Sequence, residues 1–261
     1  MPQLPWKVHI LCTQLLPTSS LKFLNSIALV LLFCAHGYAQ RDTLSFRERY
    51  MPTGVRVGTD AISIVRNFYD ESFQGWEVNA DVDFHRYFLA LEYGTWSREY
   101  PDELVSYSNK GRYWRVGADV NFLTKDPKRN VFFLGMRYAR SNFDETFRVY
   151  DTDDNWGIND RLSNPYRNTN IPSRWLELTT GLKVKMFSWF WMGYTARFKF
   201  GLATGETDEM EPHDIPGYGK TNKETTWGFN YQLMFRIPFR AYPPLPPVKK
   251  KKRPAAVETT Q

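Results

Sequence analysis

Residues 75–84 read Gly-Trp-Glu-Val-Asn-Ala-Asp-Val-Asp-Phe, and their side chains alternate strictly between two chemical kinds. Every second residue from Trp76 to Phe84 is apolar, and every residue between them is acidic or an amide. A period of two is typical of a β-strand with two unlike faces. A soluble sheet buries its apolar face against a second layer, and no helical layer is evident here. We therefore expect the apolar face to meet lipid and the charged face to line a closed interior.

The same alternation occurs in eight stretches of the chain. They are Gly54–Arg66, Gly75–Phe84, Arg86–Trp96, Gly111–Phe122, Val131–Arg140, Arg174–Phe187, Trp189–Phe200 and Thr226–Phe239. Links after the second, fourth and sixth stretches are short, and the others are long, with Ser141–Ser173 the longest. The pattern predicts an all-β fold over residues 53–240. This fold is a single eight-stranded antiparallel transmembrane β-barrel with a polar lumen, long extracellular loops and short periplasmic turns.

Aromatic residues on the apolar face gather near the ends of these stretches. Such rings favour the boundary between lipid and water. We expect them to form girdles around the barrel: Trp76, Phe84, Tyr87, Tyr93, Trp114, Phe122, Trp175 and Trp227.

The first 39 residues have the features of a secretory signal peptide. A basic lead-in precedes the short apolar core Ile27–Cys34, and the small residues of Gly37–Ala39 predict cleavage before Gln40. Both cysteines, Cys12 and Cys34, lie in the segment that would be removed. The mature chain would therefore have no disulfide and no cysteine metal site. Residues 40–52 are predicted to form a periplasmic leader into the first strand.

The last 21 residues, 241–261, differ in composition from the rest. Tyr242–Pro247 predicts an extended polyproline rod, and a basic cluster follows it. This cluster consists of Lys249, Lys250, Lys251, Lys252 and Arg253. The segment is either a disordered end or a periplasmic arm that contacts peptidoglycan, inner-leaflet lipid or another envelope protein. No basic face is interleaved with aromatic residues elsewhere, so nucleic acid is not an expected partner.

Charged residues on the face that is expected to line the interior are the candidate functional residues. They are Arg56, Asp60, Glu77, Asp81, Glu92, Arg115, Asp119, Arg137, Glu177, Lys183, Lys185, Arg197, Lys199 and Arg236. Their signs are nearly balanced, and the interior of eight strands is just wide enough for side chains. We expect an ion-pair network that plugs the lumen. The alternative is a narrow polar path for ions or a small solute.

Two loop segments carry residues that could bind a cation or perform catalysis. Four acids between the fifth and sixth strands could form a calcium site: Asp151, Asp153, Asp154 and Asp160. An EF-hand needs glycine and glutamate where the chain has Trp156 and Leu162, so a solvated acidic loop remains the alternative. After cleavage only His85 and His213 remain, and neither has a recognisable nucleophile partner. We predict no catalytic residue, cofactor or further metal site.

Several motifs resemble an uncharacterised outer-membrane β-barrel family of Bacteroidota, which is described as a domain of unknown function. Those motifs include Val55–Asp60, Tyr107–Tyr113, Arg115–Leu123, Gly135–Tyr138, Ser141–Phe143, Trp175–Leu178, Gly181–Lys185 and Ile215–Lys220. The resemblance runs from about Thr53 to Phe239, without residues 40–52 and the tail. It implies the outer membrane and the barrel fold, and it implies no ligand. Within it, Tyr107–Gly111 predicts a turn, and Ile215–Lys220 predicts a rigid loop with an exposed tyrosine.

The sequence therefore predicts a non-enzymatic outer-membrane barrel that contacts lipid and acts as a structural or docking subunit of a cell-envelope assembly. Three alternatives remain open. The first is a narrow pore or small-solute binding barrel, and the second is a small outer-membrane enzyme acting on lipid or peptide. The third is a soluble periplasmic barrel that binds lipid.

Overall fold

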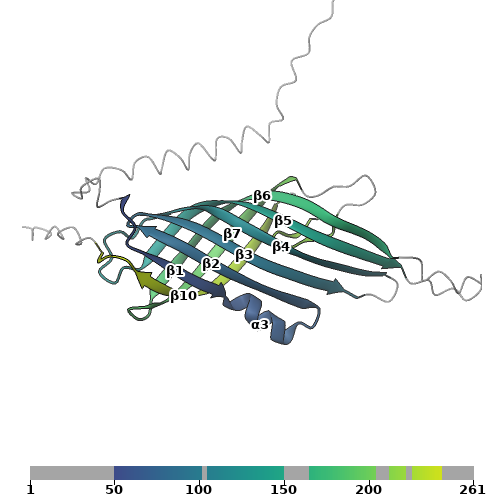
Figure 1. Ribbon diagram of the computed structural model, residues 1–261, viewed down its shortest axis with the longest axis horizontal. Helices are drawn as coiled ribbons and strands as arrows, with labels where there is room; N and C mark the ends of the chain where they lie inside the picture. Colours follow the sequence, from purple (N-terminus) through teal and green to yellow (C-terminus); the bar gives the residue numbers. More distant parts are fainter. Residues whose placement is uncertain (1–49, 102–104, 150–164, 204–211, 222–224, 243–261) are drawn as a thin grey trace, which may run out of the picture. The chain divides into compact units, whose positions relative to one another are not determined.

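The computed structural model describes residues 50–101, 105–149, 165–203, 212–221 and 225–242, all within one compact unit, Leu44–Gln261 (Figure 1). The predicted signal peptide, the acidic residues Asp151–Asp160 and the basic cluster Lys249–Arg253 lie outside the described residues. Among the described residues, no helix has the length and apolar character needed to cross a membrane.

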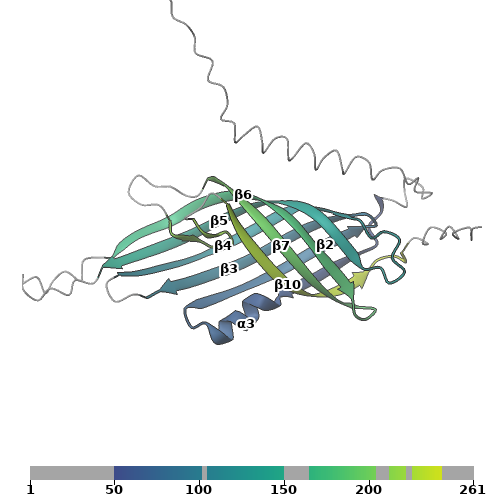
Figure 2. The ribbon, with the colours of Figure 1, turned by 180° about the vertical axis from the view of Figure 1, so that it is seen from behind.

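Eight strands close into one barrel, in which each strand is antiparallel to both neighbours (Figures 1 and 2). Around the barrel their order is β1-β10-β7-β6-β5-β4-β3-β2. Their bounds are Gly54–Asp60 (β1), Phe73–Phe84 (β2), Tyr87–Tyr100 (β3), Val105–Asn121 (β4), Val131–Val149 (β5), Tyr166–Lys185 (β6), Phe190–Ala203 (β7) and Thr225–Pro238 (β10). The predicted single eight-stranded antiparallel barrel is confirmed.

The pairing register determines how strongly the strands tilt. Paired residues can be followed around the barrel from Val57 through β2 to β7, and they lead to Thr225 in β10. Val57 itself pairs with Phe235, ten residues further along β10. Eight strands with such an offset tilt by roughly 40° from the barrel axis, and side chains fill the interior. We call the end with the turns β2–β3, β4–β5 and β6–β7 the short-turn end, and the opposite end the long-loop end.

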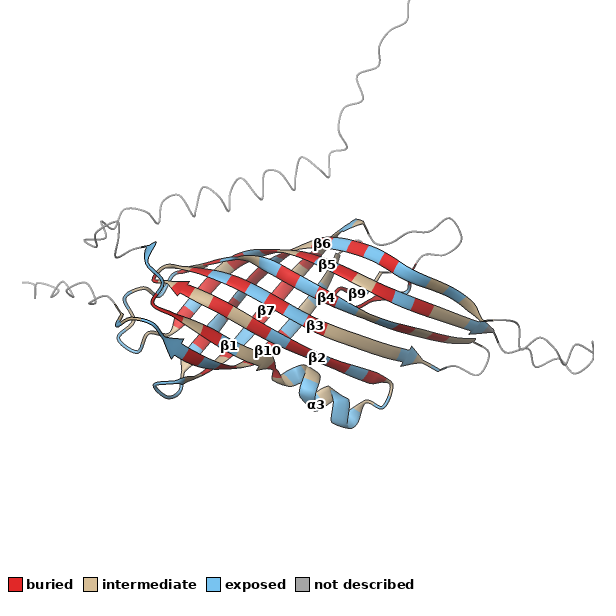
Figure 3. Cartoon of the chain, viewed as in Figure 1, coloured by how far each residue is buried: buried red, intermediate tan, exposed pale blue. Residues whose placement is uncertain are grey.

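Buried and exposed residues alternate along the strands, as Figure 3 shows. In β2, Glu77 and Asp81 are buried, whereas Trp76 and Val78 are exposed. Aromatic rings on the outer face pack in pairs between neighbouring strands toward the long-loop end. Their centroid distances are 5.8 Å for Trp76–Tyr93, 5.7 Å for Trp114–Tyr138 and 4.7 Å for Phe198–Trp227.

The second half of the first predicted strand is a helix, so the predicted strand Gly54–Arg66 is wrong beyond Asp60. Helix α3 (Ala61–Tyr69) begins where Asp60 caps it, and the Asp60 carboxylate accepts hydrogen bonds from the Ser63 N–H and hydroxyl at 3.2 and 2.7 Å. Such a side-chain cap stabilises the first helical turn. Apolar residues at Ile62, Val65 and Phe68 repeat every third residue, which is a helical rather than a strand spacing.

The strands extend further toward the long-loop end than the sequence predicts. Most of the predicted loop Ser141–Ser173 belongs to β5 and β6, and the predicted turn Tyr107–Gly111 lies within β4. In this part of the barrel the pattern is reversed: Phe143 and Ile171 point inward and are buried, whereas Arg112 points outward and is exposed. The apolar outer face is therefore shorter than the strands, and a prediction based on it ends the strands too early.

A small hairpin of two short strands, β8 (Asp214–Ile215) and β9 (Gly219–Lys220), connects β7 to β10. Its residues Ile215 and Tyr218 are 1% and 2% exposed. The predicted exposed tyrosine of this loop is therefore wrong, because Tyr218 points into the barrel. It packs edge-on against the ring of Trp175, with the ring centroids 5.6 Å apart.

Candidate functional site

The candidate charged residues lie inside the barrel, and each of its eight strands contributes at least one of them. Lys185, close to the end of β6, is half-buried. The remaining thirteen are between 0% and 8% exposed: Arg56, Asp60, Glu77, Asp81, Glu92, Arg115, Asp119, Arg137, Glu177, Lys183, Arg197, Lys199 and Arg236.

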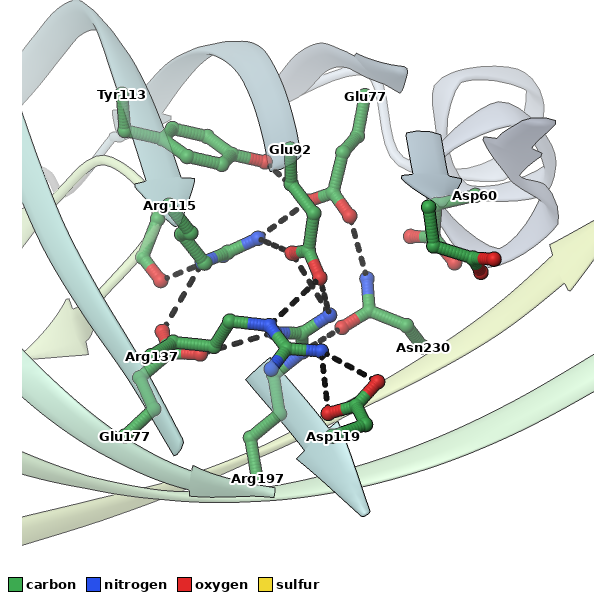
Figure 4. A network of polar contacts seen from close by, with 12 residues as sticks. Asp60, Glu77, Glu92, Tyr113, Arg115, Asp119, Arg137, Glu177, Arg197 and Asn230 are labelled. Atoms are coloured by element: carbon green, nitrogen blue, oxygen red, sulfur yellow. Dashed lines mark hydrogen bonds and ion pairs between the residues drawn. The ribbon is translucent and has the colours of Figure 1, made fainter. Parts of the chain in front are cut away.

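Two arginines and three glutamates form the centre of this set (Figure 4). Arg115 of β4 lies 2.7 Å from Glu77, 3.0 Å from Glu92 and 3.0 Å from Glu177. Arg197 of β7 approaches from the other side of the lumen, 2.8 Å from Glu92 and 2.9 Å from Glu177. Both cations thus share two carboxylates, which join β3, β4, β6 and β7 across the interior.

The network continues toward the short-turn end. Arg137 lies 3.7 Å from Glu92 and 2.7 Å from Asp119, and Lys183 lies 3.5 Å from Asp119 and 2.8 Å from Asp81. Arg56 completes the chain at 2.6 Å from Asp81. Five cations and five carboxylates are therefore connected, and they are Arg56, Arg115, Arg137, Lys183, Arg197, Glu77, Asp81, Glu92, Asp119 and Glu177. Burying charges is costly unless each has a partner, so this balance is what a closed interior requires.

An apolar layer lies beside the charges at the short-turn end. It consists of Phe88, Val131, Phe133, Trp191 and Met234. The Arg56 guanidinium lies 4.4 Å from the Phe88 ring centroid, and the Lys183 ammonium lies 4.8 Å from that of Phe133. Cations are attracted to the faces of aromatic rings, which offsets part of their desolvation. The alternation predicts a polar lumen, and it does not reveal that these aromatic side chains point inward.

A second apolar layer covers the charges at the long-loop end. It consists of Tyr113, Ala139, Phe143, Ile171, Trp175, Ile215 and Tyr218. Trp175 was predicted in the outer girdle, and this is wrong: it is 1% exposed and donates its indole N–H to Glu177 at 2.7 Å. Since Trp175 and Glu177 are two residues apart in β6, strand alternation alone places both on one face.

The β8–β9 hairpin is fastened to the charge network by its backbone. The carbonyl of Gly217 accepts hydrogen bonds from Arg115 at 3.0 Å and from Lys199 at 2.8 Å, and Lys199 also donates to the carbonyl of Tyr218 at 2.9 Å. Gly217 has a φ of 83°, a left-handed conformation that favours glycine. An added Cβ there would lie 2.5 Å from the Tyr113 ring. The hairpin thus closes against the long-loop end of the network.

Among the described residues, the cavities in the middle of the lumen and at the short-turn end are small. A cavity of about 10 Å³ lies beside Glu92, Arg137 and Lys183, and another of about 20 Å³ lies beside His85 and Tyr242. Cavities of this size hold about one water molecule each. At the short-turn end the Tyr242 ring stacks 4.1 Å from the Arg236 guanidinium, and burial raises the pKa of Tyr242 to about 12.

The two histidines considered as catalytic candidates lie at opposite ends of the barrel. His85 occupies the β2–β3 turn at the short-turn end, with a φ of 70°. At the long-loop end the His213 ring packs edge-on against Tyr100 and Tyr107, at 5.3 and 5.5 Å. Among the described residues, no group of three or more His, Asp or Glu side chains is placed to hold a metal ion.

Asp214, which follows His213 in the chain, has polar partners on β3 and β4. Tyr100 donates to the Asp214 carboxylate at 2.9 Å, and Asn109 donates to its backbone carbonyl at 2.5 Å. Burial raises the pKa of Asp214 above the usual range of a carboxyl, against the opposing effect of the Tyr100 hydrogen bond. These contacts anchor the start of the hairpin and provide no nucleophile.

One family model matches this chain over residues 17–241, and its description is a domain of unknown function, DUF6048. The match begins well before Thr53, so residues 40–52 lie inside the family match, contrary to the bounds predicted from the resemblance. The search of curated proteins gave no match.

Three solved barrel structures are similar to 72% of the chain at low identity. The N-terminal β-barrel domain of Pseudomonas aeruginosa OprF is matched over 100% of its length, with 13% identity and a TM-score of 0.39. The attachment invasion locus protein Ail of Yersinia pestis is matched over 99%, with 9% identity and a TM-score of 0.39. Neisserial surface protein A is matched over 96%, with 9% identity and a TM-score of 0.32.

Proposed function

This chain belongs to the DUF6048 family of unknown function, and we propose that it is a non-enzymatic barrel of the outer membrane with a sealed lumen. In this proposal it serves as a structural or docking subunit of a cell-envelope assembly. It acts through its surface and its ends, and no solute crosses it.

Support for a membrane location comes from the outer face. Leu89, Leu91, Met136, Leu178 and Leu182 lie on β3, β5 and β6 and are 47% to 62% exposed. A continuous apolar surface of this kind is unstable in water, whereas lipid accommodates it. Aromatic pairs such as Trp114–Tyr138 border this surface, where a bilayer would meet water.

The observation that carries the sealed lumen is the ion-pair network. Glu177 is fully buried, and it is shared between Arg115 and Arg197 from opposite walls. An ion that entered would have to separate such pairs inside a low-dielectric interior, which is costly. The apolar layers on both sides of the network add two further barriers.

A docking role is supported by what projects from the barrel. At the long-loop end β4, β5 and β6 continue past the aromatic pairs with polar outer faces, and Arg140 and Arg174 are exposed there. At the other end the sequence continues into the polyproline segment and Lys249–Arg253. In this proposal the basic cluster contacts an envelope protein or peptidoglycan from the periplasmic side.

Conductance in planar bilayers tests the sealed lumen. We expect no steady single-channel steps from the wild-type protein, and steps of constant size would overturn this part of the proposal. The variant Glu92→Ala removes a carboxylate shared by three arginines, so transient current is expected from it and shows that the protein has inserted.

Purification of tagged protein from detergent extracts tests the docking role. We expect a defined set of envelope proteins to accompany the full-length chain, and fewer to accompany a chain that lacks residues 241–261. A variant with Lys249–Arg253 replaced by glutamines separates the effect of charge from that of length. A full-length protein that always elutes alone contradicts the docking role.

The alternative of a binding barrel is favoured by one observation, a cavity behind helix α3 that is far larger than those in the lumen.

A further inference from the structure

The barrel wall has a notch on one side because β1 is short. Pairing between β1 and β10 ends at Asp60 and Gln232, and pairing between β1 and β2 ends at Thr59 and Val78. Toward the long-loop end, residues 225–231 of β10 pair only with β7, and residues 73–77 of β2 pair only with β3, among the described residues. Two strand edges thus face each other without a strand between them.

Helix α3 covers this notch, and it contacts both β2 and β10. The side chain of Asn67 replaces a missing strand partner: it exchanges hydrogen bonds with the N–H and carbonyl of Gly75 at 2.8 and 2.7 Å. On the other edge Asp60 accepts the N–H of Tyr231 at 2.9 Å. Arg66 lies 4.0 Å from the ring centroid of Phe73. A few side-chain contacts therefore join α3 to the two strand edges, whereas elsewhere in the barrel a ladder of backbone hydrogen bonds joins neighbouring strands.

Behind the helix lies a cavity of about 660 Å³, within the range of ligand-binding pockets. Its lining includes Trp227 and Phe229, which point outward, and also Gly228 and Asn230, which point inward. Successive residues of a strand face opposite sides of the sheet, so one cavity reaches both sides only around a free strand edge. The cavity therefore connects the outer face of the barrel with the long-loop end of the lumen.

The cavity combines an apolar mouth with a positively charged floor. Ile62, Phe73, Trp96, Trp227 and Phe229 supply apolar surface. Its charged lining residues are four cations and two acids, namely Arg66, Arg115, Lys199, Lys220, Asp60 and Glu77. Arg66 and Arg115 have carboxylate partners, whereas Lys199 donates to carbonyls and Lys220 lies over the Tyr100 ring. Within the described residues these two lysines form no ion pair, so the cavity carries surplus positive charge.

The notch lies at the depth where the outer leaflet would meet the barrel. Trp76 and Trp227, both exposed on the outer face, border it on β2 and β10. Helix α3 has no buried residue, and its Phe68 and Tyr69 are 81% and 86% exposed. An amphipathic helix with such rings is typical of one that lies in a membrane interface. Open strand edges at this depth are tolerated only where they border a cavity or protein.

From this geometry we propose that the notch is a lateral binding site for an acyl chain with an anionic headgroup, which enters from the outer leaflet. The chain lies between α3 and β10 against Phe73, Trp227 and Phe229. Its headgroup lies toward Lys199 and Lys220. This inference rests on the proposed membrane location, and it is independent of the docking role.

Photo-crosslinking in vesicles tests the site. The full chain is inserted into phosphatidylcholine vesicles that contain palmitic acid with a diazirine near the end of its chain, and labelled peptides are mapped by mass spectrometry. We expect labels to concentrate on α3 and on residues 225–230. The matching diazirine hexadecanol lacks the charge and should label these residues about fivefold less, the effect of one lysine near an anionic headgroup.

Two variants that carry the same new side chain separate the cavity from the general surface. Thr226→Trp places an indole in the cavity and should abolish labelling of α3, whereas Met136→Trp adds it on the opposite outer face and should leave this labelling unchanged. Lys220→Gln, at an exposed residue, should reduce the preference for the acid over the alcohol.

The positions labelled in the wild-type protein test the lateral site even if Thr226→Trp does not fold. Labels spread evenly over the outer face, including residues around Met136 and Leu178, would overturn the lateral site while leaving the membrane location intact. A protein that does not float with the vesicles would overturn both. Equal labelling by the acid and the alcohol would overturn the charged floor.

Discussion

Single residues in the lumen serve several partners at once, and Glu177 is the clearest case. It accepts from Arg115, Arg197 and the Trp175 indole. Removing one member of a buried ion pair leaves charge uncompensated and typically costs 3–5 kcal/mol. Because glutamine keeps the shape and one acceptor, we expect Glu177→Gln to lower the free energy of unfolding by about 3 kcal/mol. Urea unfolding in detergent micelles measures this change in the free energy of unfolding.

The matched control is Glu99→Gln, which removes the same charge from an exposed residue of β3. Its effect should stay within about 0.5 kcal/mol. Equal losses in both variants would mean that net charge, and not the network, determines the stability.

Sequence alternation predicted which residues face the lumen, because inside and outside differ by one position in every strand. It did not predict the partners: Glu92 of β3 meets Arg197 of β7 across the interior, and only the closed barrel brings them together. The ring type of Trp175 favours the outer girdle, whereas its position two residues before Glu177 places it on the inner face, and the structure agrees with the position.

Between β1 and α3, one residue determines where the strand ends and the helix begins. Asp60 caps α3 through Ser63 and accepts the N–H of Tyr231. Loss of a cap costs about 1 kcal/mol, and a buried N–H without a partner costs 1–3 kcal/mol. We expect Asp60→Ala to destabilise the barrel by about 2–3 kcal/mol in urea unfolding. Asp60→Asn has a single side-chain oxygen, which can still cap α3 but leaves the Tyr231 N–H without an acceptor, so we expect it to cost about 1 kcal/mol less. Similar losses in the two variants would contradict the capping role.

The β8–β9 hairpin depends on Gly217 for its position. Gly217→Ala combines a left-handed backbone with a Cβ placed 2.5 Å from the Tyr113 ring, so we expect the hairpin to leave the lumen. Limited proteolysis should then cut within residues 212–221 while the barrel remains folded. Gly219→Ala is the matched control, because its φ of 110° is also left-handed but its Cβ meets only Thr226, at 3.9 Å. Equal cleavage of both variants would assign the effect to backbone strain alone.

Docking of the hairpin should also depend on pH through Asp214. Burial raises the pKa of Asp214, so the docked hairpin holds its proton more tightly than an undocked one. The contribution of Asp214 to docking is therefore fully present below the ordinary carboxyl pKa of about 4, and it is lost as the pH rises through the raised value. A dye attached at Lys220→Cys should show higher anisotropy at acidic than at neutral pH. In Asp214→Asn this difference should disappear, and its persistence would exclude Asp214 as the cause.

Helix α3 shows why elements at the end of a strand are hard to predict. Residues 61–66 contain enough apolar residues to continue the alternation from β1, and the spacing of Ile62 and Val65 fits a helix equally well. The cap at Asp60 favours the helix, and the same carboxylate accepts the Tyr231 N–H of β10, a contact between distant segments that the local pattern does not reveal.

Along the barrel axis, the face of the strands that carries apolar side chains changes from the outer to the inner one. On β5, Met136 is exposed on an apolar outer face, whereas Phe143 is buried inside and Arg140 is exposed outside. Near the short-turn end the barrel resembles a membrane protein, and at the long-loop end it resembles a soluble one. The sequence predicted the first part well, because apolar side chains face outward there as the alternation rule assumes, whereas beyond it they face inward.

This change predicts where the bilayer ends. With cysteine at Met136 or Arg140, four residues apart on one strand, a water-soluble maleimide should react rapidly at position 140 and slowly at position 136 in intact vesicles. The two positions should react alike after transfer to urea. Rapid reaction at both positions in vesicles would contradict the membrane assignment.

The shortness of β1 has a mechanical consequence. Seven residue pairs join β1 to β10, whereas seventeen join β4 to β5. Because β1 and β10 are the first and last strands of the barrel, a tensile force applied through the two termini acts directly on this short seam, and we expect the barrel to unzip there first.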